Sequence, residues 1–342
     1  MAEPWRHEKY EQYEGGSAEA EHQVFQELAR KIAHVQEVNR RTGRLDRPDR
    51  TFHAKTSLAV DDARLRFRDD LPPDLVEGYA RPGAEYRAVV RMSAASGIPQ
   101  RDAARDPRGI AVRVVVSDDE RHDLLMLNFP ASHAADAREF VGFATVMAGA
   151  TSTLQVALRF LFALPREVGR PAANRMRRTL QAAVRRRVTS LARERYWGQT
   201  PILWGDAGPV QYQLRPVADE PPGDRPDRRN PHYLHDELAR RLRRSDVVFD
   251  LCLQRFVDGH TTPVEDASVE WREDAAPPVP VARLTVPGQD IDSEAARATA
   301  ERVDRLAFTP WRTTDAFRPL GNLNRSRDAT YGVSSARRLE EP

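Results

Sequence analysis

The sequence contains very little cysteine and very little lysine. Among 342 residues, Cys252 is the one cysteine, and Lys9, Lys31 and Lys55 are the lysines. A single cysteine cannot form an intramolecular disulfide or a thiolate metal cage, and it suits the reducing cytoplasm. Arginine therefore carries nearly all of the positive charge, and its planar guanidinium can bind carboxylates and phosphates through two parallel hydrogen bonds.

Long apolar runs and a strong net charge are also missing. The sequence has no run of about 18 apolar residues, so no spanning helix is expected. Its first 16 residues are polar and lack the apolar core of a secretory signal. The net charge of +2 excludes the strongly basic field of a general nucleic-acid-binding protein. Together these absences predict a soluble, cytoplasmic protein that does not bind nucleic acid.

Helical spacing is present near both ends of the chain and in its middle. Residues 1–16 are interpreted as a mobile tail. From Ser17 onward apolar residues recur at helical spacing, and Glu21 completes a helix-start signal. Further helices are expected at 135–148, in two halves across 151–196, and at 293–306.

Strand patterns rich in valine, leucine and methionine lie between these helices. The expected strands are 51–60, 86–94, 109–119, 123–130, 210–216, 246–257, 267–271 and 281–287. The length permits two modest domains or one large one. Eight strands with a helical insertion after the fourth predict a closed antiparallel β-barrel with surrounding helices, in an α+β fold.

The last segment contains the most informative spacing in the sequence. Arg327, Tyr331, Ser334 and Arg338 are separated by four, three and four residues, so they share one face of a predicted C-terminal helix. A helix that only seals a core would place leucines there. A phenol that acts as an anion needs a nearby cation, because it titrates near 10. Taken alone, an Arg-x-x-x-Tyr pair is more typical of a surface helix.

Four further segments change that interpretation. They are RTFHAKTSLAV (50–60), RMSAASG (91–97), RDPRGIAVRV (105–114) and DLLMLNFP (123–130). In this order, and followed by the C-terminal Arg-x-x-x-Tyr, they resemble the core segments of the heme catalase family. The resemblance covers about residues 45–338 and implies a catalase barrel of the short kind, without the flavodoxin-like domain of the full-size enzymes. It predicts a tail and helix at 1–44 and a heme-binding core at 45–342, with a helical insertion at 151–200.

On the distal side of the heme, the resemblance assigns four residues. His53 matches the distal base, Asn128 its polar partner, and Ser93 the hydroxyl that orients His53. Phe140 matches the aromatic ring over the distal heme face. A neutral histidine can take a proton from one peroxide oxygen and return it to the other, and an asparagine can donate to the peroxide without competing for protons.

On the proximal side, the resemblance assigns five residues. Tyr331 matches the axial ligand of the heme iron, a role that tyrosine has in catalase. Arg327 matches the partner of that phenolate, and Arg50, Arg91 and Arg338 match the arginines that bind the propionates. The implied cofactor is heme b.

The family implies a heme-dependent peroxidase that reduces hydrogen peroxide or organic hydroperoxides and oxidises an organic donor, with weak catalase activity. The main alternative is a lyase or isomerase that rearranges fatty-acid hydroperoxides, as the allene oxide synthase branch does. A third class, a heme carrier without turnover, needs neither His53 nor Asn128.

Three features depart from the typical family pattern. Phe52 precedes the distal histidine where typical catalases have valine, and Gly332 follows the tyrosine where they have proline. The segment 151–200 has no counterpart in the typical core. Its apolar half suggests contact with substrate or a second subunit. A homodimer is expected, because the 44-residue N-terminal segment is shorter than the arms through which full-size catalases interlock as tetramers. Its basic half, with Arg175, Arg178, Arg185 and Arg186 on one side, suggests contact with fatty acids or anionic lipid, although a solvated helix face explains it more simply.

Two other features are interpreted as structural. His232 and His235 have the spacing of metal ligands, but no third ligand accompanies them, so they are expected at the start of a surface helix. Cys252 lies in an apolar strand pattern and is expected to be a packed core thiol.

Overall fold

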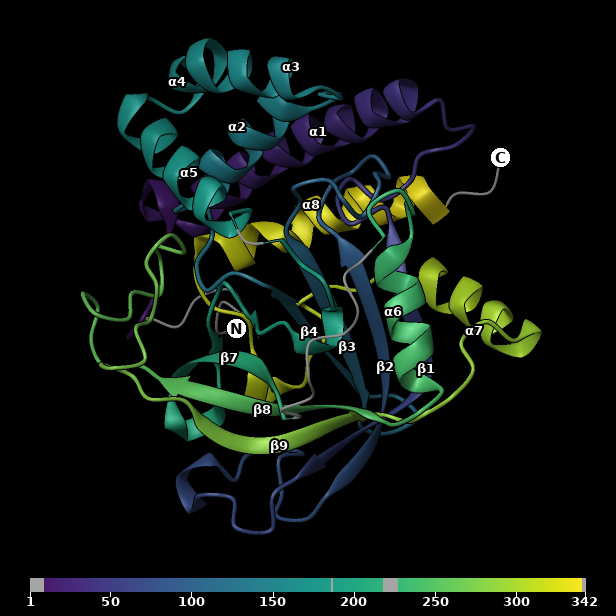
Figure 1. The fold of residues 1–342 in the computed structure, drawn as a ribbon. Helices are drawn as coiled ribbons and strands as arrows, with labels where there is room; N and C mark the ends of the chain where they lie inside the picture. The colour runs from purple at the N-terminus through teal and green to yellow at the C-terminus, as the bar shows by residue number, and fades with distance from the viewer. Residues whose placement is uncertain (1–8, 186, 218–226, 340–342) are drawn as a thin grey trace.

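A closed antiparallel barrel of eight strands forms the centre of the molecule (Figure 1). The computed structural model describes residues 9–185, 187–217 and 227–339. Around the barrel the strands pair in the order β4, β3, β2, β1, β9, β8, β7 and β5, and β5 pairs back with β4. A short ninth strand, β6, pairs with the edge of β7. The predicted α+β barrel is confirmed.

The strand bounds are β1 (Thr56–Phe67), β2 (Glu85–Ala94), β3 (Arg108–Val115), β4 (Arg121–Leu127), β5 (Tyr196–Trp197), β6 (Ile202–Leu203), β7 (Pro209–Pro216), β8 (Val247–Arg255) and β9 (Val279–Val286).

Two predictions about the strands are wrong. Residues 267–271 form a turn, because the Asp266 side chain accepts hydrogen bonds from the backbone and hydroxyl of Ser268. The eighth barrel strand is instead β5, which has only two residues and closes the ring between β4 and β7. His53, expected inside the first strand, precedes β1 and has a left-handed backbone with φ of 61°.

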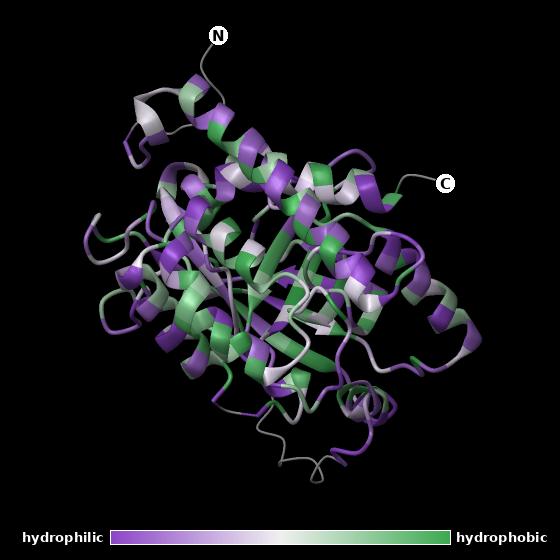
Figure 2. Cartoon of the chain, turned by 90° about the horizontal axis from the view of Figure 1, so that it is seen from above, coloured by the Kyte–Doolittle hydropathy of each residue, from purple (hydrophilic) through white to green (hydrophobic). Residues whose placement is uncertain are grey.

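Alternating apolar side chains fill the barrel, as the period of two in a strand requires. Between β2 and β3, the buried pairs are Ala88 with Val114, Val90 with Val112, and Met92 with Ile110. Figure 2 shows the hydrophobic strands inside and helices banded with hydrophilic residues around them. Cys252 of β8 is buried, as expected for a packed thiol, although it is not among the residues of the central barrel core.

The α-helices are α1 (Ala18–Gly43), α2 (Ala137–Met147), α3 (Thr153–Leu158), α4 (Leu164–Glu167), α5 (Arg170–Ala183), α6 (Tyr233–Leu242), α7 (Glu294–Arg305) and α8 (Asn322–Leu339). A π-helical turn, Arg159–Ala163, joins α3 to α4. Single 3₁₀ turns cover Glu14–Gly16, Pro73–Leu75, Leu191–Arg193, Gly205–Ala207 and Asp315–Phe317.

Most of these helices begin where their sequences predict. Ser17 caps α1 by accepting a hydrogen bond from the Ala20 amide, and Asp136 caps α2 in the same way through the Glu139 amide. His232 precedes α6, and the side chain of His235 contacts the Ser57 carbonyl and Asp292.

Along the described ranges, no helix has the length and apolar character needed to cross a bilayer.

The helix α8 lies across one end of the barrel, between the strands and a helical layer formed by α1 and α2 (Figure 1). Arg325 of α8 is 1% exposed and pairs with Glu11, Glu21 and Glu265. Residues 9–16 are therefore packed beside the start of α8 and are not the mobile tail that the sequence suggested, because Glu11 pairs with Arg318, which precedes α8, and with Arg325 inside α8. Residues 1–8 of the predicted tail lie outside the described residues.

Candidate active site

The predicted site residues lie at the end of the barrel that α8 covers. His53 comes from the segment before β1, Ser93 from β2 and Asn128 from just after β4. Tyr331 and its neighbours come from α8. The Thr51 and Ser334 hydroxyls lie 2.7 Å apart, so the segment carrying His53 is in direct contact with α8.

His53 is held both at its side chain and at its backbone. Its Nδ1 lies 3.0 Å from Ser93 Oγ, and its backbone carbonyl accepts a hydrogen bond from Arg91 at 2.7 Å. Burial lowers its pKa to about 3, and the positive charges of Arg91, Arg50 and Arg327 add to that effect. His53 is therefore neutral across the physiological pH range, which is the form that can accept a proton.

Gly109 leaves the space that the His53 ring occupies. A Cβ atom at Gly109 would lie 2.6 Å from His53 Cε1 and 2.9 Å from His53 Nδ1. Those distances are shorter than real Cβ contacts allow. This glycine belongs to the RDPRG segment, so the structure supplies a physical reason for a glycine after Arg108.

Asn128 is fixed by two hydrogen bonds to different elements. Its Oδ1 accepts a hydrogen bond from the Arg108 amide at 2.7 Å, and its Nδ2 donates to Glu194 Oε2 at 3.0 Å. An amide nitrogen carries two N–H groups, so one donor remains beyond the bond to Glu194. The side chain therefore has a defined orientation beside the strand that carries Gly109.

Arg50, Arg91 and Arg338 gather around the end of α7. Arg91 is 3% exposed and donates to Asp304 Oδ1 at 2.8 Å and to Thr56 Oγ1 at 2.7 Å. Arg50 and Arg338 both donate to the backbone carbonyls of Asp304 and Leu306. Of the five N–H groups on each guanidinium, these bonds use two on Arg50 and two on Arg338, and Arg91 uses three when its bond to the His53 carbonyl is included.

Burial and the neighbouring charges shift the pKa values of Arg50, Arg338 and Asp304. Burial and the positive charges of Arg91 and Arg338 lower the pKa of Arg50 to about 9. Burial also lowers the pKa of Arg338. The pKa of the Asp304 carboxyl is lowered, since the attraction of Arg91 and the hydrogen bond from Thr56 outweigh its burial. The cluster is therefore suited to bind a ligand that carries further carboxylates.

On α8, Arg327 lies one turn before Tyr331, as the spacing predicts. The Arg327 guanidinium carbon is 6.0 Å from the centroid of the Tyr331 ring. Arg327 Nη1 donates to Thr200 Oγ1 and to Asn324 Oδ1, both at 3.0 Å, and these two oxygens fix its orientation. Both side chains are half-buried.

Aromatic rings extend outward from the residue beside His53. Phe52 and Phe140 make an edge-to-face contact with centroids 5.6 Å apart. Phe140 in turn lies 5.3 Å from the His133 ring, which is 4.4 Å from Phe143. Phe52 and Phe140 both pack against the apolar cluster between α1 and α2, so the assignment of Phe140 to the distal heme face stays a prediction.

Sequence reasoning missed several residues that hold this site together. Asp304, Glu194 and Thr200 contact site residues from distant parts of the chain. No motif marks them, since each acts through a long-range contact. Within the described part of the chain, no three His, Cys, Asp or Glu side chains are placed to bind a metal ion directly.

Solved catalases share this fold. The chain is similar to a fungal catalase with a TM-score of 0.67 and 20% identity, covering 86% of this chain and 60% of that one. It is similar to a bacterial catalase with a TM-score of 0.65 and 18% identity, covering 86% and 58%. For catalase A of Saccharomyces cerevisiae the values are 0.66, 16%, 86% and 62%. The chain thus spans about three fifths of the length of these catalases.

Sequence similarity narrows the assignment. No protein-family model matches the chain. It is 30% identical to a catalase-related peroxidase of Mycolicibacterium paratuberculosis over 297 residues, which is 83% of this chain and 87% of that protein. The chain belongs to the heme catalase superfamily, among the catalase-related peroxidases.

Proposed function

We propose that this protein is a heme-dependent peroxidase that reduces hydrogen peroxide or small organic hydroperoxides and oxidises an organic donor in the cytoplasm, with weak catalase activity. The observation that carries the proposal is the neutral His53 imidazole, held by Ser93 and Gly109 at the barrel end that also carries Tyr331.

The residues fit a heme. Arg50, Arg91 and Arg338 form a cationic cluster with N–H donors to spare, which suits the two propionates. Tyr331 would bind the heme iron through its phenol oxygen, with Arg327 favouring the phenolate. We propose heme b, held without covalent attachment, because the single cysteine is buried in β8 and cannot form a thioether there. When bound, heme supplies the redox-active iron centre at which the O–O bond of a peroxide is cleaved.

His53 performs the proton transfers. Its neutral imidazole accepts the proton from one peroxide oxygen and returns it to the other as the bond breaks. The Ser93 hydroxyl fixes the ring orientation at Nδ1, which leaves Nε2 for the peroxide. Asn128, oriented by Arg108 and Glu194, offers its remaining N–H to a peroxide oxygen.

A second candidate function is rearrangement of fatty-acid hydroperoxides without an external reductant. The contact between Phe52 and Phe140 favours it, because Phe52 directly precedes the proton-transferring His53 in the chain and brings a pair of apolar rings to that segment. An acyl chain would find an apolar surface there that a small peroxide does not require.

One purified preparation separates these activities. Oxygen release from hydrogen peroxide, oxidation of a phenolic dye, and loss of a fatty-acid hydroperoxide without reductant are measured side by side. We expect dye oxidation to dominate. His53→Ala should abolish all three, and retention of full activity in that variant would refute the distal mechanism. Tyr331→Phe should grossly alter the absorbance spectrum of the ferric heme, and an unchanged spectrum would refute the proximal assignment.

A further inference from the structure

The outermost helices of the molecule expose a row of large apolar side chains. Figure 1 shows α3 and α4 above α2, on the side away from the barrel. Leu154 is 69% exposed, Leu158 48%, Leu161 66% and Phe162 52%. They are four of the seven exposed large hydrophobic residues in the described part of the chain, and all lie within nine consecutive positions. A cluster of this kind marks an interaction surface.

The fold does not need these side chains for its own stability. The inner face of the same helices is already packed. Leu164, Ala173 and Met176 are buried against Phe140, Phe143 and Phe160. The outer row, Leu154 to Phe162, therefore faces away from a core that is complete without it.

Exposed arginines are frequent in the same segment of the chain. Residues 151–187 contain nine arginines and one acidic residue, Glu167. Glu167 pairs with Lys31 of α1 at 3.5 Å. The exposed arginines among the described residues of this segment are Arg166, Arg170, Arg177, Arg178, Arg185 and Arg187. Arg186, which the sequence placed on the same side, lies outside the described residues. The neighbouring surface of α1 exposes Arg30 and Lys31 beside Glu27.

We propose that α3 to α5 dock on an anionic lipid surface, with Leu154, Leu158, Leu161 and Phe162 inserted among the lipids and the arginines against the headgroups. A short helix with apolar and arginine-rich faces is the pattern of an interfacial segment. Nine helical residues span only about 13 Å, less than half of a bilayer core, so the row lies in the interface. A second copy of the chain fits poorly, because two arrays of arginines would face each other.

The proposal is independent of the peroxidase activity and is tested by co-sedimentation. The full-length protein is mixed with vesicles of phosphatidylglycerol and phosphatidylcholine in equal parts, or of phosphatidylcholine alone, at low and physiological ionic strength. We expect binding to the anionic vesicles that weakens with salt. No binding to anionic vesicles at either salt concentration would overturn the proposal.

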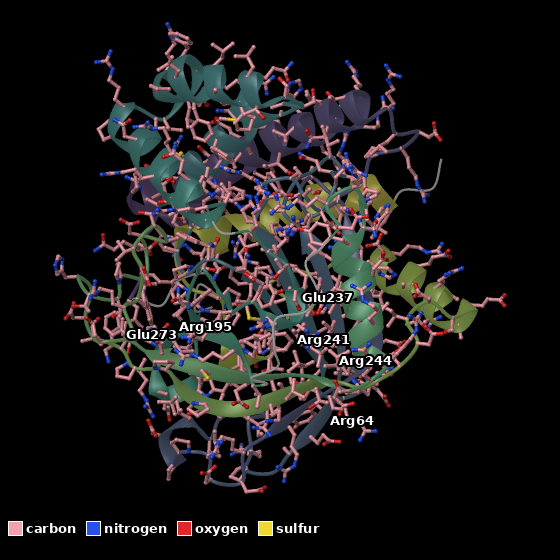
Figure 3. The ribbon with its side chains drawn as sticks, viewed as in Figure 1. Arg64, Arg195, Glu237, Arg241, Arg244 and Glu273 are labelled. Atoms are coloured by element: carbon pink, nitrogen blue, oxygen red, sulfur yellow. The ribbon has the colours of Figure 1, made fainter. Side chains whose placement is uncertain are left out.

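Three double variants locate the contact. Leu161→Ser with Phe162→Ser should weaken binding at least tenfold, because both large apolar groups are lost from the interface. Arg177→Gln with Arg178→Gln should weaken it about fivefold for each arginine removed. The matched control is Arg240→Gln with Arg244→Gln, a pair of exposed arginines away from α3 to α5; Arg240 lies in α6, and Arg244, labelled in Figure 3, lies just after it. Equal losses in the control and α5 variants would overturn the proposal.

Two further measurements distinguish other occupants. The molar mass in solution is determined by light scattering for the wild type and the Leu161→Ser, Phe162→Ser variant. A dimer that this variant converts to a monomer, with vesicle binding unchanged, would assign the surface to a second copy and overturn the proposal. Binding to soluble polyglutamate as tight as to vesicles, and insensitive to the same variant, would assign it to an acidic protein and also overturn it.

Discussion

Asp304 is the acidic side chain that the buried Arg91 contacts, and Asp304→Asn tests how the cationic cluster is stabilised. In the wild type, Asp304 Oδ1 accepts hydrogen bonds from Arg91 Nε and Thr56 Oγ1. The variant keeps the shape of the side chain and removes its charge. Arg91, at 3% exposure, then lies near two other guanidiniums without that carboxylate.

The expected loss of unfolding free energy is about 1–3 kcal/mol at neutral pH. Breaking a fully buried pair costs about 3–5 kcal/mol. Asp304 is 45% exposed, so solvent screening reduces that value. The folded state holds the pKa of Asp304 below its usual value. Its contribution is therefore complete above the unfolded pKa of about 4, and it disappears as the pH falls through the folded pKa.

The assay is urea unfolding of both proteins from pH 7 down to pH 3, followed by circular dichroism. The difference between wild type and variant should be constant from pH 7 to pH 5 and should shrink below about pH 4. Asp119→Asn, an exposed carboxylate in the turn between β3 and β4, is the matched control and should cost almost nothing. A loss below about 0.5 kcal/mol for Asp304→Asn, or a difference that grows in acid, would refute the reasoning.

Four further variants follow from the structure. His53→Gln should make the stability of the protein less sensitive to acid between pH 6 and pH 4, measured by urea midpoints. In the folded wild type His53 has a pKa of about 3 and stays neutral in this range, whereas in the unfolded chain it binds a proton below about pH 6.5. An unchanged pH profile would contradict this. Gly109→Ala should lower peroxide turnover about a hundredfold with a small change in melting temperature, because its Cβ displaces the His53 ring; wild-type turnover would contradict it. Arg325→Met should cost about 3–5 kcal/mol in urea unfolding, since it leaves buried carboxylates without their cation; a cost near zero would show that those carboxylates become protonated or hydrated. Gly332→Ala should raise stability by up to about 1 kcal/mol, because the position is exposed in α8 with open space around the added methyl group; a lower melting temperature would count against this.

Much of the barrel was predictable because its strands carry strong local signals. In segments such as 109–119 and 281–287 the apolar side chains alternate clearly, and the structure has β3 and β9 there. The strand β5 could not be found in this way, because two residues have no periodicity. The segment 267–271 alternates like a strand, but the Asp266 side chain satisfies its backbone in a turn.

The site shows the same division between local and distant information. Helical spacing placed Arg327 and Tyr331 on one face, and α8 does bring them together. The partners that orient these groups were not predictable. Asp304 reaches Arg91 across 213 positions of sequence, and Glu194 reaches Asn128 across 66. Such pairs depend on how the barrel closes, which no local pattern encodes.

The pairing of Arg325 with Glu11, Glu21 and Glu265 also constrains how the chain can fold during synthesis. The ribosome releases the carboxylates at positions 11, 21 and 265 long before it releases the cation at position 325. Until then, burying these carboxylates together without their cation is unfavourable, so α1 is expected to remain undocked. A nascent chain that stalls just before α8 should therefore keep its N-terminal end accessible to protease, and completing those last residues should protect the opposite end of the chain.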